Sequence, residues 1–175
     1  SASAVAESLF HLAWLYRSQG RLAEAERPFQ RSLTIRERAF GRDHLDVAST
    51  LNGLAALYNA LGRNAEAEPL YERALRIRLK ALGPDHPLVA TSMNNLGYFY
   101  YSQGRTAEAE PLLVHSLEIR ERVFGPDHPR TAGPLENLGS LYGDQGRRAD
   151  CERFYKRALV VNEKALGPDH PAVAR

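Results

Sequence analysis

Apolar residues along this chain recur at spacings of three and four residues, which is the period of an α-helix with one buried face. In the stretch 88–102, Val89, Met93 and Leu96 would line one side of such a helix, followed by Tyr100. No segment alternates apolar and polar residues at the period of two that predicts a half-buried strand. The pattern therefore predicts an all-α protein.

The helical pattern returns every 42 residues along the chain. Two glycine series, each advancing by that step, set the register: Gly20, Gly62, Gly104 and Gly146, and Gly41, Gly83, Gly125 and Gly167. A fixed period of this size is typical of a solenoid, in which each repeat packs only on its neighbours. We predict a single array over residues 1–175, with these repeats: 4–41, 46–83, 88–125 and 130–167, and the start of a fifth at 168–175.

Each repeat is predicted to form two helices joined by a glycine turn. The first helices, called helix A, and the second helices, called helix B, are expected at these positions: A at 4–18, 46–60, 88–102 and 130–144, and B at 22–40, 64–82, 106–124 and 148–166. Pro87 suits the start of the third helix A, and either Asp85 or His86 would cap it. Thr106 would cap the helix B that follows. Pro134 removes a hydrogen bond after the first turn, so the fourth helix A is expected to start late or to bend.

Composition limits the partners and the compartment. The formal net charge of +2 is too balanced to favour nucleic acid or an anionic membrane as the partner. The chain has no apolar run of roughly 18 residues that could span a membrane, and its first residues lack the features of a secretory signal. The single cysteine, Cys151, excludes an internal disulfide and fits a reducing compartment, so we expect a cytoplasmic protein.

The recurring positions resemble those of a known family. They hold, in the second and third repeats, Leu51, Leu54, Ala55, Tyr58, Gly62, Ala67, Tyr71 and Ala74, and Met93, Leu96, Gly97, Tyr100, Gly104, Ala109, Leu113 and Ser116. This series resembles the tetratricopeptide repeat along essentially the whole chain. The 42-residue length and the Leu-Gly-Pro-Asp-His-Pro linker are similar to the repeats of kinesin light chain and of related bacterial arrays. The resemblance implies a right-handed α-solenoid of stacked antiparallel helix pairs, with small residues such as Gly97, Ala109 and Ser116 where the two helices pack closely.

The residues most suggestive of chemistry are the Asp-His pairs, one in each linker: Asp43-His44, Asp85-His86, Asp127-His128 and Asp169-His170. They lie a whole repeat apart, so we expect them to cap helices and not to converge on a metal ion or a catalytic centre. Cys151 takes the small position of helix B that Ala109 holds one repeat earlier, which favours packing over a reactive thiol. There is no phosphate-binding loop and no nucleophile motif. We therefore expect no catalytic activity, no cofactor and no metal site.

The resemblance implies that helix A lines a concave groove and that this groove binds a partner. Mapped onto this chain, the candidate groove residues are Trp14, Arg17, Asn52, Asn59, Asn94, Asn95, Tyr98, Tyr101 and Asn137. The four asparagines at 52, 94, 95 and 137 would form a ladder of amides able to donate to and accept from an extended peptide backbone. Arg17 is the only cation among the groove positions, which argues against the family's clamp for carboxylate termini and against RNA.

Small residues of the second repeat, Gly53 among them, are expected to leave a pocket in this groove. Phe10 and Trp14 would lie on one side of it and Tyr98 and Tyr101 on the other, a shape that suits an apolar or aromatic anchor. Structural alternatives stay open for some of these residues. Phe10 and Trp14 are alternatively interior contacts exposed by loss of a preceding repeat. The amides of Asn95 and Asn137 alternatively bond to the backbone of a neighbouring repeat.

We predict a non-catalytic scaffold that binds a peptide or a partner protein in the groove. One alternative is the regulatory or sensor arm of a larger bacterial signalling ATPase or protease. In support of it, the sequence starts at Ser1 without a methionine and ends on the opening of a further helix, so the natural protein is expected to continue. Another alternative is an array that self-associates through its uncapped ends.

Overall fold

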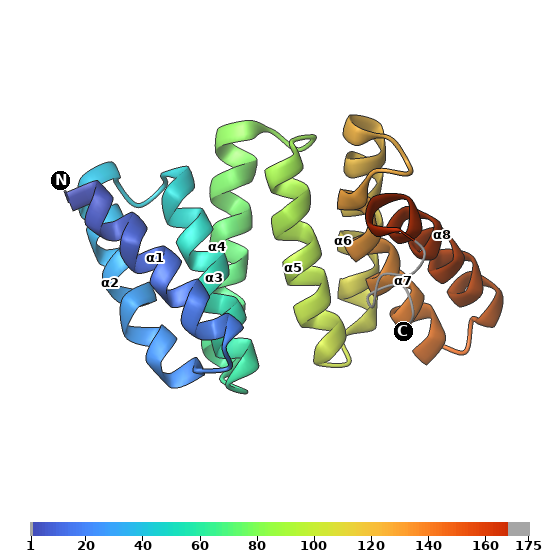
Figure 1. The fold of residues 1–175 in the computed structure, drawn as a ribbon, viewed down its shortest axis with the longest axis horizontal. Helices are drawn as coiled ribbons and strands as arrows, with labels where there is room; N and C mark the ends of the chain where they lie inside the picture. Colours follow the sequence, from blue (N-terminus) through green and yellow to red (C-terminus); the bar gives the residue numbers. More distant parts are fainter. Residues whose placement is uncertain (1, 168–175) are drawn as a thin grey trace. The chain divides into compact units, whose positions relative to one another are not determined.

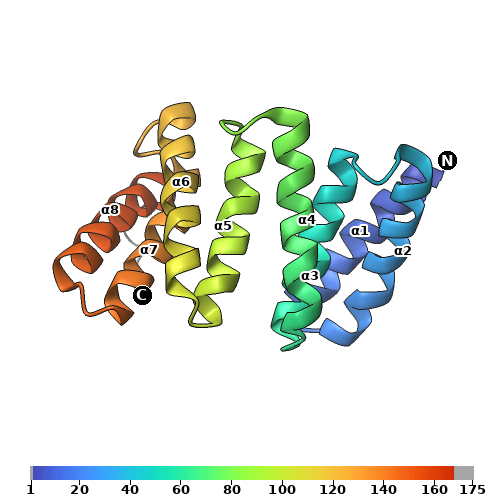
Figure 2. The ribbon, with the colours of Figure 1, turned by 180° about the vertical axis from the view of Figure 1, so that it is seen from behind.

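A computed structural model describes residues 2–167, and this part of the chain contains eight α-helices, one short 3₁₀ helix and no strand. The chain divides into two compact units, Ser1–Pro84 and Asp85–Arg175, here called the N-terminal and C-terminal units. Each unit holds two of the predicted repeats (Figure 1 and Figure 2). The fourth Asp-His pair at 169–170 and the predicted opening of a fifth repeat at 168–175 lie outside the described residues.

The N-terminal unit is built from two antiparallel helix pairs. Its helices are α1 (Ala2–Ser18), α2 (Leu22–Phe40), α3 (Leu45–Ala60) and α4 (Asn64–Leu82). Within each pair, α1 packs on α2 and α3 packs on α4, and α2 also packs on α3 to join the two repeats. The core at this joint includes Val47, Leu51 and Ile77, with Leu33 of α2 packed against them.

The C-terminal unit repeats the same scheme. Its elements are α5 (Pro87–Ser102), α6 (Thr106–Phe124), the 3₁₀ helix η1 (Pro129–Thr131), α7 (Ala132–Asp144) and α8 (Arg148–Leu166). Here α5 packs on α6, α7 packs on α8, and α6 packs on α7. Every predicted helix B has the predicted bounds, and every helix A starts within two residues of its predicted start. The all-α prediction is confirmed.

The glycine turns explain why the helix B boundaries could be placed so well. All eight glycines of the two series have positive φ, for example 73° at Gly104 and 79° at Gly83. Such backbone conformations are disfavoured for residues with a Cβ, so glycine marks the places where these helices stop.

The linker histidines cap helix A. The Nδ1 atom of His86 accepts from the backbone N–H of Leu88 at 3.1 Å, and His44 caps α3 in the same way, whereas His128 caps η1, the 3₁₀ helix before α7. The linker aspartate instead pairs with a cation near the end of a helix B, as Asp43 does with Lys80 at 3.0 Å. Capping therefore accounts for the histidine of each described pair, as predicted, whereas the aspartates form ion pairs and the prediction of a capping role is corrected for them. The prediction for Thr106 was wrong, because Arg105 precedes the helix and makes no side-chain cap.

Pro134 delays the start of α7, as predicted. A 3₁₀ turn at Pro129–Thr131 precedes the helix, which begins only at Ala132. A proline at 134 has no N–H to donate to the carbonyl of residue 130. The guanidinium of Arg120 from α6 donates to that carbonyl. Arg36 makes the corresponding bond to the carbonyl of Asp46, where no proline follows, so this contact belongs to the joint between repeats and is not specific to Pro134.

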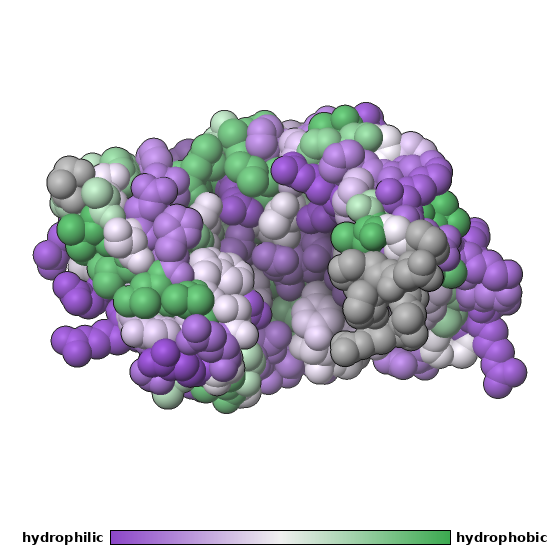
Figure 3. All heavy atoms as spheres, in the orientation of Figure 1, coloured by the Kyte–Doolittle hydropathy of each residue, from purple (hydrophilic) through white to green (hydrophobic). Residues whose placement is uncertain are grey.

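Small residues bring the two helices of a repeat together, also as predicted. A Cβ added to Gly97 would lie 2.9 Å from the side chain of Leu113 and 3.3 Å from the carbonyl oxygen of Ala109. The hydroxyl of Ser116 donates to the carbonyl of Ala90 at 2.7 Å, and Ser32 makes the corresponding bond in the first repeat. In contrast, α1 carries exposed hydrophobic side chains along its length (Figure 3).

Candidate functional site

Two helix A elements of the C-terminal unit, α5 and α7, contact each other and share a polar and aromatic surface. We call this surface the α5–α7 face and define it by Asn94, Tyr98, Tyr101, Asn137 and Asp144. The amide of Asn137 donates to Oδ1 of Asn94 at 3.0 Å. The hydroxyl of Tyr101 donates to Oδ2 of Asp144 at 2.6 Å. Both bonds join α5 to α7, so they hold the side chains of the face in fixed positions.

The α5–α7 face keeps groups that a partner could contact. Tyr98 is 47% exposed, and its ring centroid lies 6.4 Å from that of Tyr101 in a tilted arrangement. Asn94 and Asn137 are half-buried. Their mutual bond uses one donor hydrogen of Asn137 and one acceptor site of Asn94, so both amides retain further donor and acceptor capacity. The face therefore combines an aromatic surface with amides suited to a peptide backbone.

Asp144 gives the α5–α7 face a negative charge and sets the protonation of its neighbour. The hydrogen bond to Asp144, followed by partial burial, raises the pKa of Tyr101 to about 12. The phenol therefore stays protonated at neutral pH and acts as a hydrogen-bond donor. No other charged residue belongs to the face as defined here.

Tyr155 and Ser140 extend the α5–α7 face toward α8. The hydroxyls of these two residues lie 2.7 Å apart, and the ring of Tyr155 packs over Gly139, where an added Cβ would lie 3.1 Å away. Sequence reasoning did not place Tyr155 in the site. The signal that could have found it is the glycine at 139, which leaves room for a large ring opposite.

In the N-terminal unit, the candidate aromatic residues are packed against each other. The Trp14 ring lies edge-on to Phe10 and Phe29, with centroids 6.3 and 6.0 Å away, and Arg17 stacks over it at 5.0 Å. A Cβ on Gly53 would lie 2.7 Å from the Phe29 ring and 3.4 Å from Nε1 of Trp14. The space above Gly53 is thus filled by the chain's own rings. Gly53 itself therefore leaves no free space for a partner's side chain, whereas Trp14 remains 36% exposed.

The asparagines of the predicted amide ladder differ in burial. Asn52 is buried, with 6% of its surface exposed, so it lies in the core of the N-terminal unit and not on a surface. Asn59 and Asn95 are half-buried, on α3 and α5. Of the four asparagines, Asn94 and Asn137 are the pair that the described contacts join, side chain to side chain and not to the backbone that the alternative expected.

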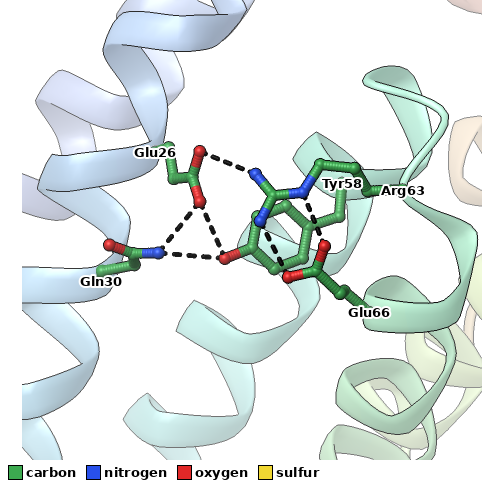
Figure 4. Close-up of polar contacts among 5 residues, drawn as sticks. All are labelled: Glu26, Gln30, Tyr58, Arg63 and Glu66. Atoms are coloured by element: carbon green, nitrogen blue, oxygen red, sulfur yellow. Dashed lines mark hydrogen bonds and ion pairs between the residues drawn. The ribbon is translucent and has the colours of Figure 1, made fainter.

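A second polar cluster, which the sequence reasoning missed, joins consecutive repeats (Figure 4). The guanidinium of Arg63 stacks 4.2 Å from the centre of the Tyr58 ring and pairs with Glu66 at 2.7 Å and with Glu26 at 2.8 Å. The hydroxyl of Tyr58 donates to Glu26 at 3.1 Å and accepts from Gln30 at 3.0 Å. Side chains of α2, α3 and the turn before α4 therefore meet in one cluster.

The same cluster recurs in the C-terminal unit. Arg147 stacks 4.0 Å from the centre of the Tyr142 ring, and both residues contact Glu110 of α6. Arg147 also pairs with Asp150 of α8.

The ion pairs of the N-terminal cluster shift the pKa values of their partners. The pKa of Arg63 is raised by Glu66 and Glu26, and Arg63 in turn lowers the pKa of Glu66. The signal for this cluster was present in the sequence as a tyrosine five residues before an arginine at each glycine turn.

No group of three or more His, Cys, Asp and Glu side chains between residues 2 and 167 could hold a metal ion. Cys151 is half-buried, and its Sγ would lie 3.3 Å from a Cβ on Gly143, which agrees with a packing role. A membrane-spanning helix, long and apolar enough, is also absent from this part of the chain.

Family models of the tetratricopeptide repeat match this sequence over most of its length. One model matches residues 46–113 and again 90–159, and a second matches residues 5–46. Among curated proteins, no relative was found.

Solved structures with similar folds include kinesin light chain-like arrays. BtubC (BKLC) from P. vanneervenii is 27% identical over 93% of this chain, with a TM-score of 0.79, and this chain spans 64% of its length. A Podosopora anserina protein assigned as a kinesin light chain, with nearly identical TPR-like (tetratricopeptide-like) repeats, is 24% identical over 99% of this chain. Its TM-score is 0.81, and 82% of its chain is covered. PilF of Pseudomonas aeruginosa is 21% identical over 99% of this chain, with a TM-score of 0.73 and 66% of its own chain covered. The two last similarities concern the fold alone.

Proposed function

Because the chain belongs to the tetratricopeptide repeat family, whose members are generally non-catalytic protein-interaction scaffolds, we propose that it binds an extended segment of a partner protein on the α5–α7 face. The observation that carries this proposal is the exposed ring of Tyr98 beside two side-chain pairs held in place by hydrogen bonds. Exposed aromatic rings next to fixed polar groups are typical of protein interfaces.

The chemistry of the α5–α7 face suggests what the partner segment contains. Asn94 and Asn137 are suited to the N–H and C=O groups of an extended backbone. Asp144 and the exposed Glu136 lie on α7, so a basic side chain in the segment would be attracted to this helix. An arginine could stack on Tyr98 and pair with Asp144 at the same time. The proposed partner is therefore an extended segment with an arginine or an aromatic residue.

We expect the affinity to be in the micromolar range, because a flexible segment loses conformational entropy when it binds. We further propose that the four repeats act as one array in a reducing, cytoplasmic compartment. The single cysteine, which can form no internal disulfide, supports that compartment.

A peptide-display selection from the host proteome tests the proposal. Wild type, the double variant Asn94→Ala/Tyr98→Ala and the control Val123→Ala would be selected in parallel. Val123 is 46% exposed and lies on α6, outside the face. Peptides that are enriched by wild type and by the control, but lost with the double variant, would support binding at the α5–α7 face. Peptides retained equally by all three proteins would contradict it.

A further inference from the structure

The first helix carries an apolar stripe on its outer side. Val5, Leu9, Leu12 and Leu15 follow one another at spacings of four, three and three, so they lie on one side of α1. Val5 is 49%, Leu12 37% and Leu15 51% exposed. Figure 3 shows hydrophobic side chains along this helix. We call these four residues the outer α1 face. Single exposed leucines are ordinary on a protein surface, but a continuous stripe marks an interface.

Internal repeats show what such a stripe contacts. The corresponding residues of α3, where α2 packs, are Val47, Leu51, Leu54 and Leu57, and those of the η1–α7 segment, where α6 packs, are Thr131, Leu135, Leu138 and Leu141. Each of these eight residues is at most 3% exposed. The stripe is therefore shaped to receive the helix B of a preceding repeat.

The last described helix, α8, presents the opposite half of such a contact. Leu159 holds the position of Leu33, which packs against Val47 and Leu51 in the N-terminal unit. Leu159 is 42% exposed, whereas Leu117 of α6, at the same repeat position, is 6% exposed. We define the outer α8 face by Leu159 together with Glu152 and Glu163, two carboxylates on the same helix.

The charges at the two ends match the ion pairs of the internal joints. Glu152 holds the position of Glu26, which binds the Tyr58 and Arg63 cluster. Tyr16 and Arg21 form the same stacked pair in the first repeat, with 4.2 Å between the guanidinium and the ring centre. In one copy Glu152 pairs with Lys156 at 2.6 Å, but an exposed pair of this kind contributes little stability and can be exchanged.

A second ion pair between consecutive repeats also has one counterpart on α2 and one on α8. Glu37 pairs with Arg73 at 2.6 Å between α2 and α4, and Glu121 pairs with Arg157 between α6 and α8. Arg31 occupies the repeat position of Arg73, one repeat earlier. Glu163 occupies the repeat position of Glu37, three repeats later. Both are exposed.

We propose that this chain associates head to tail, with the outer α8 face of one copy on the outer α1 face of the next, in the register of the α2–α3 joint. Leu159 would then contact Val5 and Leu9 of the neighbouring copy, Glu163 would pair with Arg31, and Glu152 would contact Tyr16 and Arg21. The occupant is a second copy because one chain carries both halves of each apolar and charged contact. The contact is heterologous, so copies can add at both ends.

Sedimentation over a concentration series up to roughly 100 µM, a range that detects weak interfaces, tests this proposal. The average mass of wild type should rise with concentration. Leu15→Glu, which blocks the α1 side, and Leu159→Glu, which blocks the α8 side, should each be monomeric, because a buried unpaired charge opposes the contact. Both sites are exposed in a single copy, so circular dichroism should show unchanged helix content.

Mixing the two blocked variants distinguishes a head-to-tail contact from a symmetric one. Leu15→Glu keeps its α8 side and Leu159→Glu keeps its α1 side, so the mixture should form a 1:1 heterodimer and nothing larger. A wild type that stays monomeric throughout, or a mixture that forms no heterodimer, would overturn the proposal.

Charge reversal tests the register. Arg31→Glu or Glu163→Arg alone should weaken association by about tenfold, and the two changes in one chain should restore it. Arg27→Glu makes the same charge change on α2 at a position that has no counterpart in the internal ion pairs, and it should leave association unchanged. Failure of the double change to restore association would contradict the register.

Discussion

The same repeat positions hold a cluster of packed rings in the N-terminal unit and a more exposed ring in the C-terminal unit, with Trp14 36% and Tyr98 47% exposed. Trp14 and Gly53 in the first unit correspond to Tyr98 and Asn137 two repeats later. Over Gly53 the ring of Phe29 and the indole of Trp14 fill the space. Where Asn137 replaces the glycine, Tyr98 remains 47% exposed and the asparagine bonds to α5. The residue at this position is thus a glycine under packed rings in one unit and a hydrogen-bonded asparagine beside an exposed ring in the other.

The largest loss of unfolding free energy is expected from filling the space above Gly53. Gly53→Ala places a Cβ 2.7 Å from the Phe29 ring, so the variant should lose roughly 1–3 kcal/mol of unfolding free energy. Urea denaturation measures this loss, and the fluorescence of Trp14, the single tryptophan, reports it locally.

Gly133→Ala is the matched control for this change. Gly133 is also helical, and an added Cβ there meets nothing within 4 Å. The control should change stability much less than Gly53→Ala, because the preference of alanine for a helix, about 0.5–1 kcal/mol, is opposed by the clash of its Cβ with the ring of Pro134. Equal stabilities of the two variants would show that the rings over Gly53 are not tightly packed.

A smaller loss of stability is expected when one buried serine hydroxyl is removed from either unit. The loss should be similar in both, because their cores are built alike. Ser32→Ala and Ser116→Ala each remove a buried hydroxyl that donates to a helix carbonyl at 2.7 Å. Each should cost about 1 kcal/mol, the usual net value of such a bond. Thermal unfolding of both variants measures the two losses. A large loss in one variant alone would mean that the units differ in their cores as well as on their faces.

The smallest effect on stability is expected from the pH dependence of the Tyr101–Asp144 hydrogen bond in the C-terminal unit. The pKa of Tyr101 is raised from 10.0 to about 12 when the protein is folded. The stability that this bond contributes is therefore fully present below pH 10.0 and is lost as the pH rises through about 12. Asp144→Asn should lower the pKa of Tyr101, as measured by phenolate absorbance with Tyr101→Phe as the reference. An unchanged titration would contradict the assigned cause.

Much of the fold could be predicted from the sequence because its signals are local. Glycines with positive φ end the helices, and Pro134 acts within its own turn. Such signals depend on backbone geometry and not on the neighbouring repeats. The choice between Asp85 and His86 as the cap could not be made, because either side chain can accept the helix N–H.

The site could be predicted only in part, because it depends on how consecutive repeats are staggered. The bonds Asn94–Asn137 and Tyr101–Asp144 each join residues 43 positions apart, one more than the repeat length. That extra residue reflects the stagger of α5 against α7, which a repeat pattern does not give. The burial of Asn52 and the filled space at Gly53 depend in the same way on side chains from other helices.

We propose that the partner binds the α5–α7 face and not the aromatic cluster of the N-terminal unit. The dissociation constant of one selected peptide, measured by fluorescence anisotropy with Tyr98→Ala and with Trp14→Ala, distinguishes these two surfaces. We predict that Tyr98→Ala weakens binding by about tenfold or more, as loss of an aromatic anchor does, while Trp14→Ala leaves the affinity of the folded protein nearly unchanged. The reverse result, with binding lost in Trp14→Ala and kept in Tyr98→Ala, would contradict this claim.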